Sequence, residues 1–354
     1  MRRPRAGCCR TPARPPCRCS RSAGAYCRGS TPTSCARPSR RSSASSCCDP
    51  PERGRMERWA TLSRGRRLKN RLIAAAARET LAAATHLPGL LAIDLGARLG
   101  RAVGRVAGGE RRRVERHLGE ALGMRPGDPA TRRRALAVFE HLGRSAGELA
   151  WAWRDASRVR ALARFVPGAR ETMERLRAGG RGVLFVTGHL GNWELLSWAI
   201  RVAGIPCAPV GRSSYDPDLH ALIETWRRRW GAGMLWRESP RIADEIAAAV
   251  EAGVSVGVLI DQATDLPSVR VPFFGRPART VIGPARLALA RNIPVVVGTI
   301  RRRPEGYHVI EIDESPPPDG PDPATAWTAA WTAALERAIR DEPEQWVWMH
   351  DRWR

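Results

Sequence analysis

The sequence predicts an α/β fold in which a mostly parallel sheet is layered with helices, preceded by an N-terminal helical region that associates with a membrane. Two apolar runs, residues 254–260 and 294–300, have the length and composition of strands buried on both faces of a parallel sheet. From about Gly180 onward, strand-like runs alternate with helical segments, which is the pattern of a layered α/β sheet. The other expected strands are 183–187, 207–210 and an edge strand at 307–312, and the expected helices are 193–203, 218–230, 242–251, 286–291 and 324–340.

Composition divides the chain into three parts. Residues 1–55 hold eight of the nine cysteines and 13 arginines, together with many serines and prolines. These cysteines do not have the spacing of zinc ligands, and no histidine accompanies them. The segment also lacks the apolar stretch of a secretory signal. We therefore expect a disordered or artefactual extension at 1–55, a helical region at 56–166 and an α/β domain at 167–354.

The helical region at 56–166 begins with a basic segment, 66–72, before a stretch rich in alanine and leucine. Its longest uncharged part, 80–93, contains Pro88 and is shorter than the roughly 20 residues that span a bilayer. A helix hairpin in the membrane interface fits this pattern, with basic side chains at the lipid headgroups and leucines below them. An ordinary helical cap on the α/β domain fits it equally well.

The basic character of the chain is unevenly distributed. The formal net charge is +24, of which +11 belongs to residues 1–55, and every basic residue except Lys69 is arginine. Codon usage explains that skew as readily as phosphate binding does. The net positive charge of residues 56–354 suits an anionic partner such as a membrane surface or a phosphorylated lipid. Nucleic acid is not an expected partner, because neither a basic aromatic platform nor a helix-turn-helix pattern is visible.

His189 and Glu194 are the strongest candidates for catalytic residues. The strand at 183–187 leads into a glycine-containing turn that carries His189, and Asn192 is a good N-cap for the following helix. Placed before the helix, His189 projects from the carboxyl end of a strand, where open α/β sheets bind their ligands. A carboxylate that contacts the imidazole would orient it as a general base for a hydroxyl. For this pair taken alone, a structural histidine at a turn is the alternative.

Two segments, around Ser145 and Ser255, match the G-x-S-x-G pattern of serine hydrolases. A nucleophile elbow needs a strand that enters the motif and a helix that leaves it. Ser145 lies inside a helical pattern and Ser255 begins a strand, so neither match indicates a nucleophile. No metal site is expected, because no HExxH pattern or third ligand accompanies His189. No cofactor is expected either, since the turn around His189 lacks the G-x-G-x-x-G spacing of dinucleotide-binding folds.

A second group of candidate residues follows the strand at 254–260. An apolar, arginine-containing segment at 270–280 comes after it and predicts an apolar slot with a phosphate-binding rim. For its two phenylalanines, a hydrophobic loop packed on the core is the alternative. The arginine run at 227–229 is interpreted as a solvated face. The candidate substrate-binding residues are therefore Arg212, Asp261, Gln262, Phe273, Phe274, Arg276 and Arg279, with Arg270 beside them.

Several ordered blocks of this sequence resemble the lipid A biosynthesis acyltransferases, the lauroyl and myristoyl acyltransferase group of the lysophospholipid acyltransferase superfamily. The blocks are GHLGNWE at 188–194, DQ at 261–262, VPFFG at 271–275, ART at 278–280 and PEQWVWMHDRW at 343–353. The resemblance runs from about residue 62 to the C-terminus and does not extend to residues 1–55. Ala263 departs from the family pattern, which often has a second acid after the Asp-Gln pair, so any role of that acid is absent or moved.

The resemblance implies direct transfer of an acyl chain from acyl carrier protein, or from acyl-CoA, to a hydroxyl of a membrane glycolipid. Residues 167–354 would form the acyltransferase domain, acting at the cytoplasmic face of the cell inner membrane. His189 would be the general base, Glu194 would hold its imidazole in the productive tautomer, and arginines such as Arg212 would bind phosphate. A phosphatidylinositol mannoside or other lysolipid acyltransferase shares the same blocks. A non-catalytic membrane lipid-binding protein is the alternative from a different class.

Overall fold

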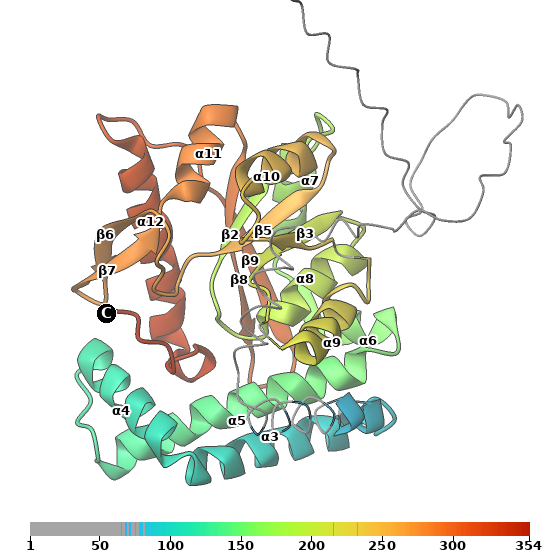
Figure 1. Cartoon of the computed structure of the whole chain (residues 1–354). Coiled ribbons are helices and arrows are strands. Elements are labelled where there is room, and N and C mark those ends of the chain that lie inside the picture. The colour runs from blue at the N-terminus through green and yellow to red at the C-terminus, as the bar shows by residue number, and fades with distance from the viewer. Residues whose placement is uncertain are drawn as a thin grey trace, which may run out of the picture. The chain divides into compact units, whose positions relative to one another are not determined.

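The computed structural model describes residues 65, 68, 71, 75, 78–80, 82–214, 216–231 and 233–354. A seven-stranded mixed sheet with the order β1-β9-β8-β2-β5-β3-β4 lies at its centre (Figure 1). Strands β8, β2, β5, β3 and β4 run parallel to one another, whereas β9 pairs antiparallel with β8 and parallel with β1. The strands are β1 (Ala163–Phe165), β2 (Leu184–Thr187), β3 (Cys207–Gly211), β4 (Leu235–Trp236), β5 (Ser255–Leu259), β8 (Val295–Arg302) and β9 (His308–Glu314).

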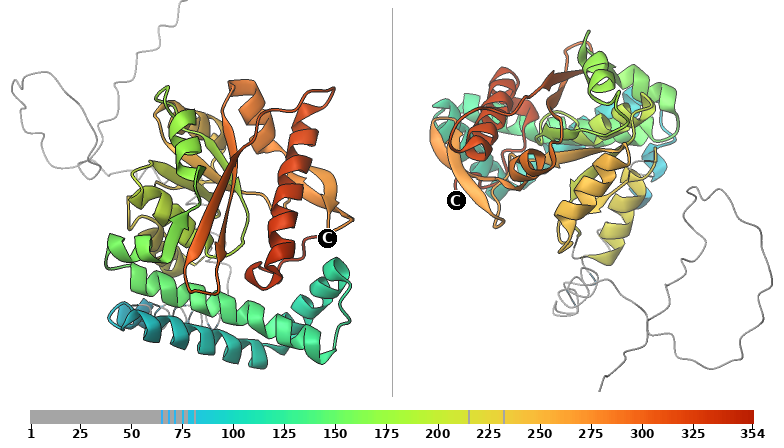
Figure 2. Two further views of the ribbon diagram at one scale, coloured as in Figure 1. Left: turned by 180° about the vertical axis from the view of Figure 1, so that it is seen from behind. Right: turned by 90° about the horizontal axis from the view of Figure 1, so that it is seen from above.

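Helices cover both faces of the sheet, as the two views of Figure 2 show. Side chains of β2 alternate between the faces, so that Leu184 and Val186 join one core cluster and Phe185 joins the other. Burial on both faces explains why the central strands read as continuous apolar runs. The covering helices are α6 (Ala156–Leu162), α7 (Ala169–Leu176), α8 (Trp193–Val202), α9 (Pro217–Arg227), α10 (Ile242–Glu251), α11 (Gly283–Arg291) and α12 (Pro323–Asp341).

Helices α3 (Gly89–Val106), α4 (Gly108–Leu122) and α5 (Pro129–Ala152) form a helical layer along one edge of the α/β part (Figure 1). Glycines allow the backbones of α3 and α5 to approach each other closely. A side chain at Gly143 would not fit, because its Cβ would overlap the carbonyl oxygen of Gly96. The outer side of α3 is apolar, and Leu90 and Val106 are 87% and 84% exposed. Within the part of the chain that the structure describes, no helix has the length and apolar character needed to cross a membrane.

An antiparallel hairpin and the C-terminal tail form a third core cluster with the helical layer. Strands β6 (Ser268–Phe273) and β7 (Arg276–Val281) pair around a two-residue turn, in which Phe274 and Gly275 both have positive φ. The 3₁₀ turn η1 (Pro343–Gln345) leads into Trp346 and Trp348, which are buried beside the hairpin and α4. The tail therefore joins the hairpin to the helical layer.

The strands and helices predicted between residues 183 and 340 are present, with ends displaced by no more than three residues. The expectation that 307–312 forms an edge strand is wrong, because β9 lies between β1 and β8. Strand β1 lies inside the region at 56–166 for which only helices were expected, and β4 and the β6–β7 hairpin were not predicted. The extension predicted at 1–55 lies outside the described residues.

Candidate active site

A cavity of about 480 Å³ opens at the carboxyl ends of β3 and β5. Much of its wall is apolar, formed by side chains such as Val258 of β5, Ile246 of α10 and Leu287 of α11. This is the position at which open α/β sheets bind ligands, and an apolar wall with few polar groups is typical of binding sites for organic ligands. The polar residues that line it include His189, Glu194, Arg212, Arg227, Arg237 and Gln262.

His189 stands on the turn between β2 and α8, at the edge of this cavity. Its Nδ1 lies 2.8 Å from Asp261 Oδ1, and its backbone N–H donates to Asp261 Oδ2 over 2.6 Å. Because a carboxylate only accepts hydrogen bonds, Nδ1 carries the proton and the neutral ring keeps its lone pair on Nε2. That nitrogen lies 3.2 Å from Gln262 Nε2. Gly191 allows the turn, since a Cβ there would overlap the Ile300 carbonyl oxygen.

Asp261 is buried behind the imidazole and has a second side-chain donor, the indole N–H of Trp346 at 2.7 Å. Burial by itself raises the pKa of this carboxyl group, but the positive charge and hydrogen bonds of His189 and the Trp346 bond together lower its pKa to about 2. Asp261 is therefore an anion at neutral pH, and both of its carboxylate oxygens accept hydrogen bonds from His189. A direct substrate contact, predicted for Asp261 from the sequence, does not agree with its burial.

Glu194 does not fulfil the expectation that it orients His189. Both of its carboxylate oxygens accept hydrogen bonds from the Arg227 guanidinium, at 2.6–3.1 Å. The reason is geometric: Glu194 lies in the first turn of α8 and faces α9, while the Nδ1 of His189 is already bound to Asp261. Glu194 and Arg227 nevertheless line the same cavity as His189. The interpretation of 227–229 as a solvated face thus fails for Arg227.

The remaining predicted residues separate into two groups. Arg212 and Gln262 line the cavity. Phe273 and Phe274 are buried in the third core cluster instead, which is the packing alternative considered for them. The three arginines of the hairpin, Arg270, Arg276 and Arg279, are not among the residues that line the cavity. Arg276 pairs with Glu120 and stacks on Trp353, and Arg279 donates to Ser268. The apolar slot exists, but α10, α11 and the ends of β3 and β5 form it, in place of the segment at 270–280.

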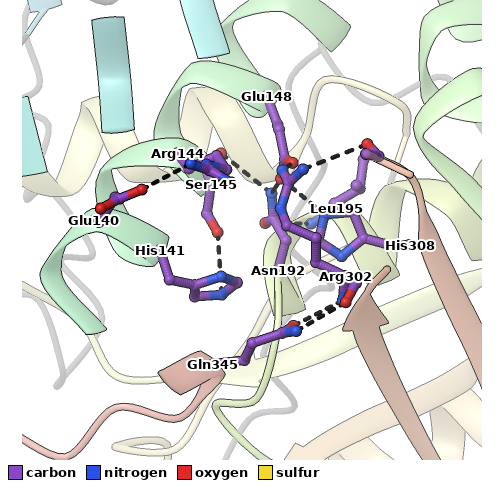
Figure 3. Close-up of polar contacts among 11 residues, drawn as sticks. Glu140, His141, Arg144, Ser145, Glu148, Asn192, Leu195, Arg302, His308 and Gln345 are labelled. Atoms are coloured by element: carbon purple, nitrogen blue, oxygen red, sulfur yellow. Dashed lines mark hydrogen bonds and ion pairs between the residues drawn. The ribbon is translucent and has the colours of Figure 1, made fainter. Parts of the chain in front are cut away.

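A buried polar network supports the turn that carries His189 (Figure 3). Asn192 caps α8 through the Leu195 N–H and donates to Glu148 Oε2 of α5 over 2.9 Å. The same carboxylate is 2.9 Å from His308 Nε2 and forms an ion pair with Arg302. Glu148 and His308 are both fully buried. The network ties the helical layer to β8, β9 and the start of α8.

Four residues near the site were not proposed from the sequence as functional: Arg227, Arg237, Trp346 and His350. Trp346 and His350 lie in the segment at 343–353, which resembles the C-terminal motif of the family. That motif could have indicated both residues from the sequence. The ring of His350 lies 6.2 Å from that of His189. Desolvation, followed by the positive charge of His189, lowers the pKa of His350.

The two serine motifs lie where the sequence predicted: Ser145 is inside helix α5, and Ser255 is the first residue of strand β5.

Comparison with known proteins identifies the family of this chain. The family model described as bacterial lipid A biosynthesis acyltransferase matches residues 66–354. The chain is also 29% identical over 239 residues to the lipid A biosynthesis lauroyltransferase of Escherichia coli (strain K12), a match that covers 63% of this chain and 72% of that protein. The chain belongs to the bacterial lipid A biosynthesis acyltransferase family, and its activity is acyl transfer.

Proposed function

We propose that this protein transfers a fatty acyl chain from a thioester, carried by acyl carrier protein or by coenzyme A, to a hydroxyl of a lipid A precursor. The observation that carries the proposal is the position of the His189–Asp261 pair at the edge of a large apolar cavity. The cavity provides a hydrophobic site for the acyl chain, and His189 provides a base where the chain's carbonyl group would lie. Family membership supports the reaction class.

In the proposed reaction, His189 Nε2 takes the proton of the acceptor hydroxyl while its oxygen attacks the thioester carbonyl carbon. The carbon–sulfur bond then breaks, and the imidazolium returns the proton to the leaving thiolate, so atoms and charge balance. Asp261 keeps Nδ1 protonated and stabilises the imidazolium while it exists. Its lowered pKa of about 2 suits that role, because the carboxylate stays charged at any working pH.

Arg212, Arg227 and Arg237 are proposed to bind phosphate groups of the donor or the acceptor. All three line the cavity together with His189, and a guanidinium matches the geometry of phosphate oxygens. Glu194 holds Arg227 through bonds to both of its oxygens and thereby fixes the direction of that guanidinium. Gln262 is proposed to donate to the thioester carbonyl oxygen once substrate separates its amide from His189 Nε2.

The outer side of α3 is proposed to lie in the interface of the inner membrane, at its cytoplasmic face, where a lipid acceptor would be found. Leu90, Leu95, Leu99 and Val106 are exposed along this helix, and basic residues such as Arg105 are interspersed with them. An apolar stripe bordered by basic side chains suits an anionic lipid surface. This orientation would leave the α/β part of the protein outside the bilayer.

The proposal is tested with the full chain in detergent, a lauroyl thioester and a lipid A precursor that has a free hydroxyl, followed by mass spectrometry of the glycolipid. His189→Ala should lower kcat by about 10²–10⁴-fold, the usual contribution of a general base. Ser145→Ala and Ser255→Ala are matched controls that should retain most of the activity. Unchanged transfer by His189→Ala, or loss confined to a serine variant, would refute the mechanism. Parallel reactions with the two thioester carriers identify the donor.

A further inference from the structure

A second, smaller chamber of about 40 Å³ lies beside the cavity, between the sheet and α8. Four residues line both spaces: Trp193, Ser197, Pro209 and Leu259. The rest of the chamber wall is mostly apolar or small, comprising Met173, Phe185, Thr187, Leu196, Ile200, Cys207, Ser255 and Gly257. The shared residues make the chamber an adjoining extension of the cavity, on the opposite face of the sheet from α10 and α11.

The chamber continues away from His189 along the strands and along α8. Ile200 lies about 10 Å beyond Trp193 on the axis of α8, given the rise of an α-helix. On the other wall, Gly257 lies about 7 Å before Leu259 on β5, given the rise of a strand. Both walls therefore lead inward from the turn that carries His189. An extended acyl chain whose carbonyl group lies at His189 would direct its far end toward this chamber.

Gly257 lines this chamber, although neither its backbone conformation nor its neighbours require a glycine at this position. A Cβ at Gly257 would meet Pro209 Cα at 3.6 Å and Pro209 Cβ at 3.9 Å, which is ordinary van der Waals contact. Its φ is not in the left-handed region, so a larger residue fits the backbone. Gly298 on β8 differs, because a Cβ there would overlap the Phe185 ring. Packing thus requires glycine at 298, whereas at 257 the missing side chain leaves open volume.

We propose that Gly257 determines acyl-chain length, by leaving room in the chamber for the terminal methylene groups of the transferred chain. This inference rests on the proposed function. A side chain at 257 would occupy the volume that those carbons need, so long chains would be excluded while shorter chains still reach His189. Removing side-chain volume from the α8 wall, at Leu196, would enlarge the chamber and admit longer chains.

The test is transfer from a series of saturated acyl thioesters, from ten to about sixteen carbons in steps of two, to one glycolipid acceptor. For Gly257→Val, kcat/KM for the longest chain that the wild type uses well should fall about 10- to 200-fold relative to a chain two carbons shorter, the discrimination expected for about one methylene in an apolar pocket. Leu196→Ala should shift the profile in the opposite direction. Gly109→Val, in α4 and away from the chamber, is the control and should keep the wild-type profile.

The length profile separates this inference from the proposed function. If the wild type transfers no acyl chain to any glycolipid, the proposed function fails. If it transfers chains and the profile is the same in Gly257→Val, Leu196→Ala and wild type, only the assignment of Gly257 fails. Thermal unfolding shows whether each variant is folded. Should Gly257→Val not fold, Gly257→Ala decides the question with a smaller shift in the same direction.

Discussion

The helical layer and the α/β part of this protein bury different kinds of surface. In the α/β part, side chains of both sheet faces meet apolar helices, and the apolar surface is inside. In the helical layer, Gly96, Gly100 and Gly143 bring the backbones of α3 and α5 together, and leucines of α3 point outward. The contrast indicates that α3 and α5 use little side-chain volume where they meet, and that α3 leaves several large apolar side chains exposed.

Part of the contact between the two layers is polar and buried. Glu148 and His141 of α5 face a group that includes Arg302, His308 and Asn192 from the α/β part (Figure 3). Burial is the main reason that the pKa values of His141 and His308 are lowered to about 3. Since Asn192 caps the helix that follows His189, this contact links the helical layer to the turn that carries His189.

Acid should separate the two layers, and this is the largest effect we expect. His141 and His308 have a pKa of about 3 in the folded protein and about 6.5 as ordinary histidines, so unfolding takes up two protons between these values. The free energy of unfolding should become independent of these histidines above about pH 7.5, and should fall by up to about 2.7 kcal/mol per pH unit as the pH decreases from 6 to 4. Denaturant unfolding across this range measures the slope. A slope that His308→Gln leaves unreduced would contradict the coupling.

Substitution at the glycine contact should have the next largest effect. Gly143→Ala places a methyl group on the carbonyl oxygen of Gly96 and should cost about 2 kcal/mol or more of unfolding free energy. Gly109→Ala in α4 is the matched control, because nothing lies within 4 Å of the added Cβ. Alanine is the better helix former, so this control should raise stability by up to about 1 kcal/mol. Equal effects of the two changes would show that α3 and α5 do not pack through backbone contact.

The outward leucines of α3 should affect lipid binding and leave the fold intact. Leu90→Gln combined with Leu99→Gln removes apolar surface that is already exposed, so thermal unfolding should change little. Binding to vesicles containing anionic phospholipid should weaken at least about tenfold, because each leucine contributes apolar area to the interface. Co-sedimentation measures this. Arg105→Gln should mainly reduce the salt-sensitive part of binding, and unchanged binding of both variants would exclude this face as the docking surface.

The central strands were predictable from sequence because burial on both faces makes β2, β5 and β8 continuous apolar runs. Strand β1 was not predictable, because it is only three residues long. The β6–β7 hairpin was not predictable because its turn is Phe274-Gly275, which lacks the Asn-Gly sequence typical of two-residue hairpin turns. The position of His189 on a turn before a helix was predictable, since the glycines of the turn and the N-cap Asn192 are local signals. Its partner was not, because Asp261 reaches His189 only through the pairing of β2 with β5. Local spacing favoured Glu194, which instead pairs with Arg227 on another helix.

The most direct test of this account compares the two carboxylates, Asp261 and Glu194, by single-turnover acyl transfer at saturating substrate. Asp261→Asn should lower the rate of transfer by about 10³-fold or more, because it removes the charge that fixes the His189 tautomer and stabilises the imidazolium. Glu194→Gln should act mainly on KM and lower the rate by about tenfold at most, because the amide still accepts from Arg227. If Asp261→Asn retains near wild-type transfer while Glu194→Gln loses it, the assignment of Asp261 as the partner of the base is wrong.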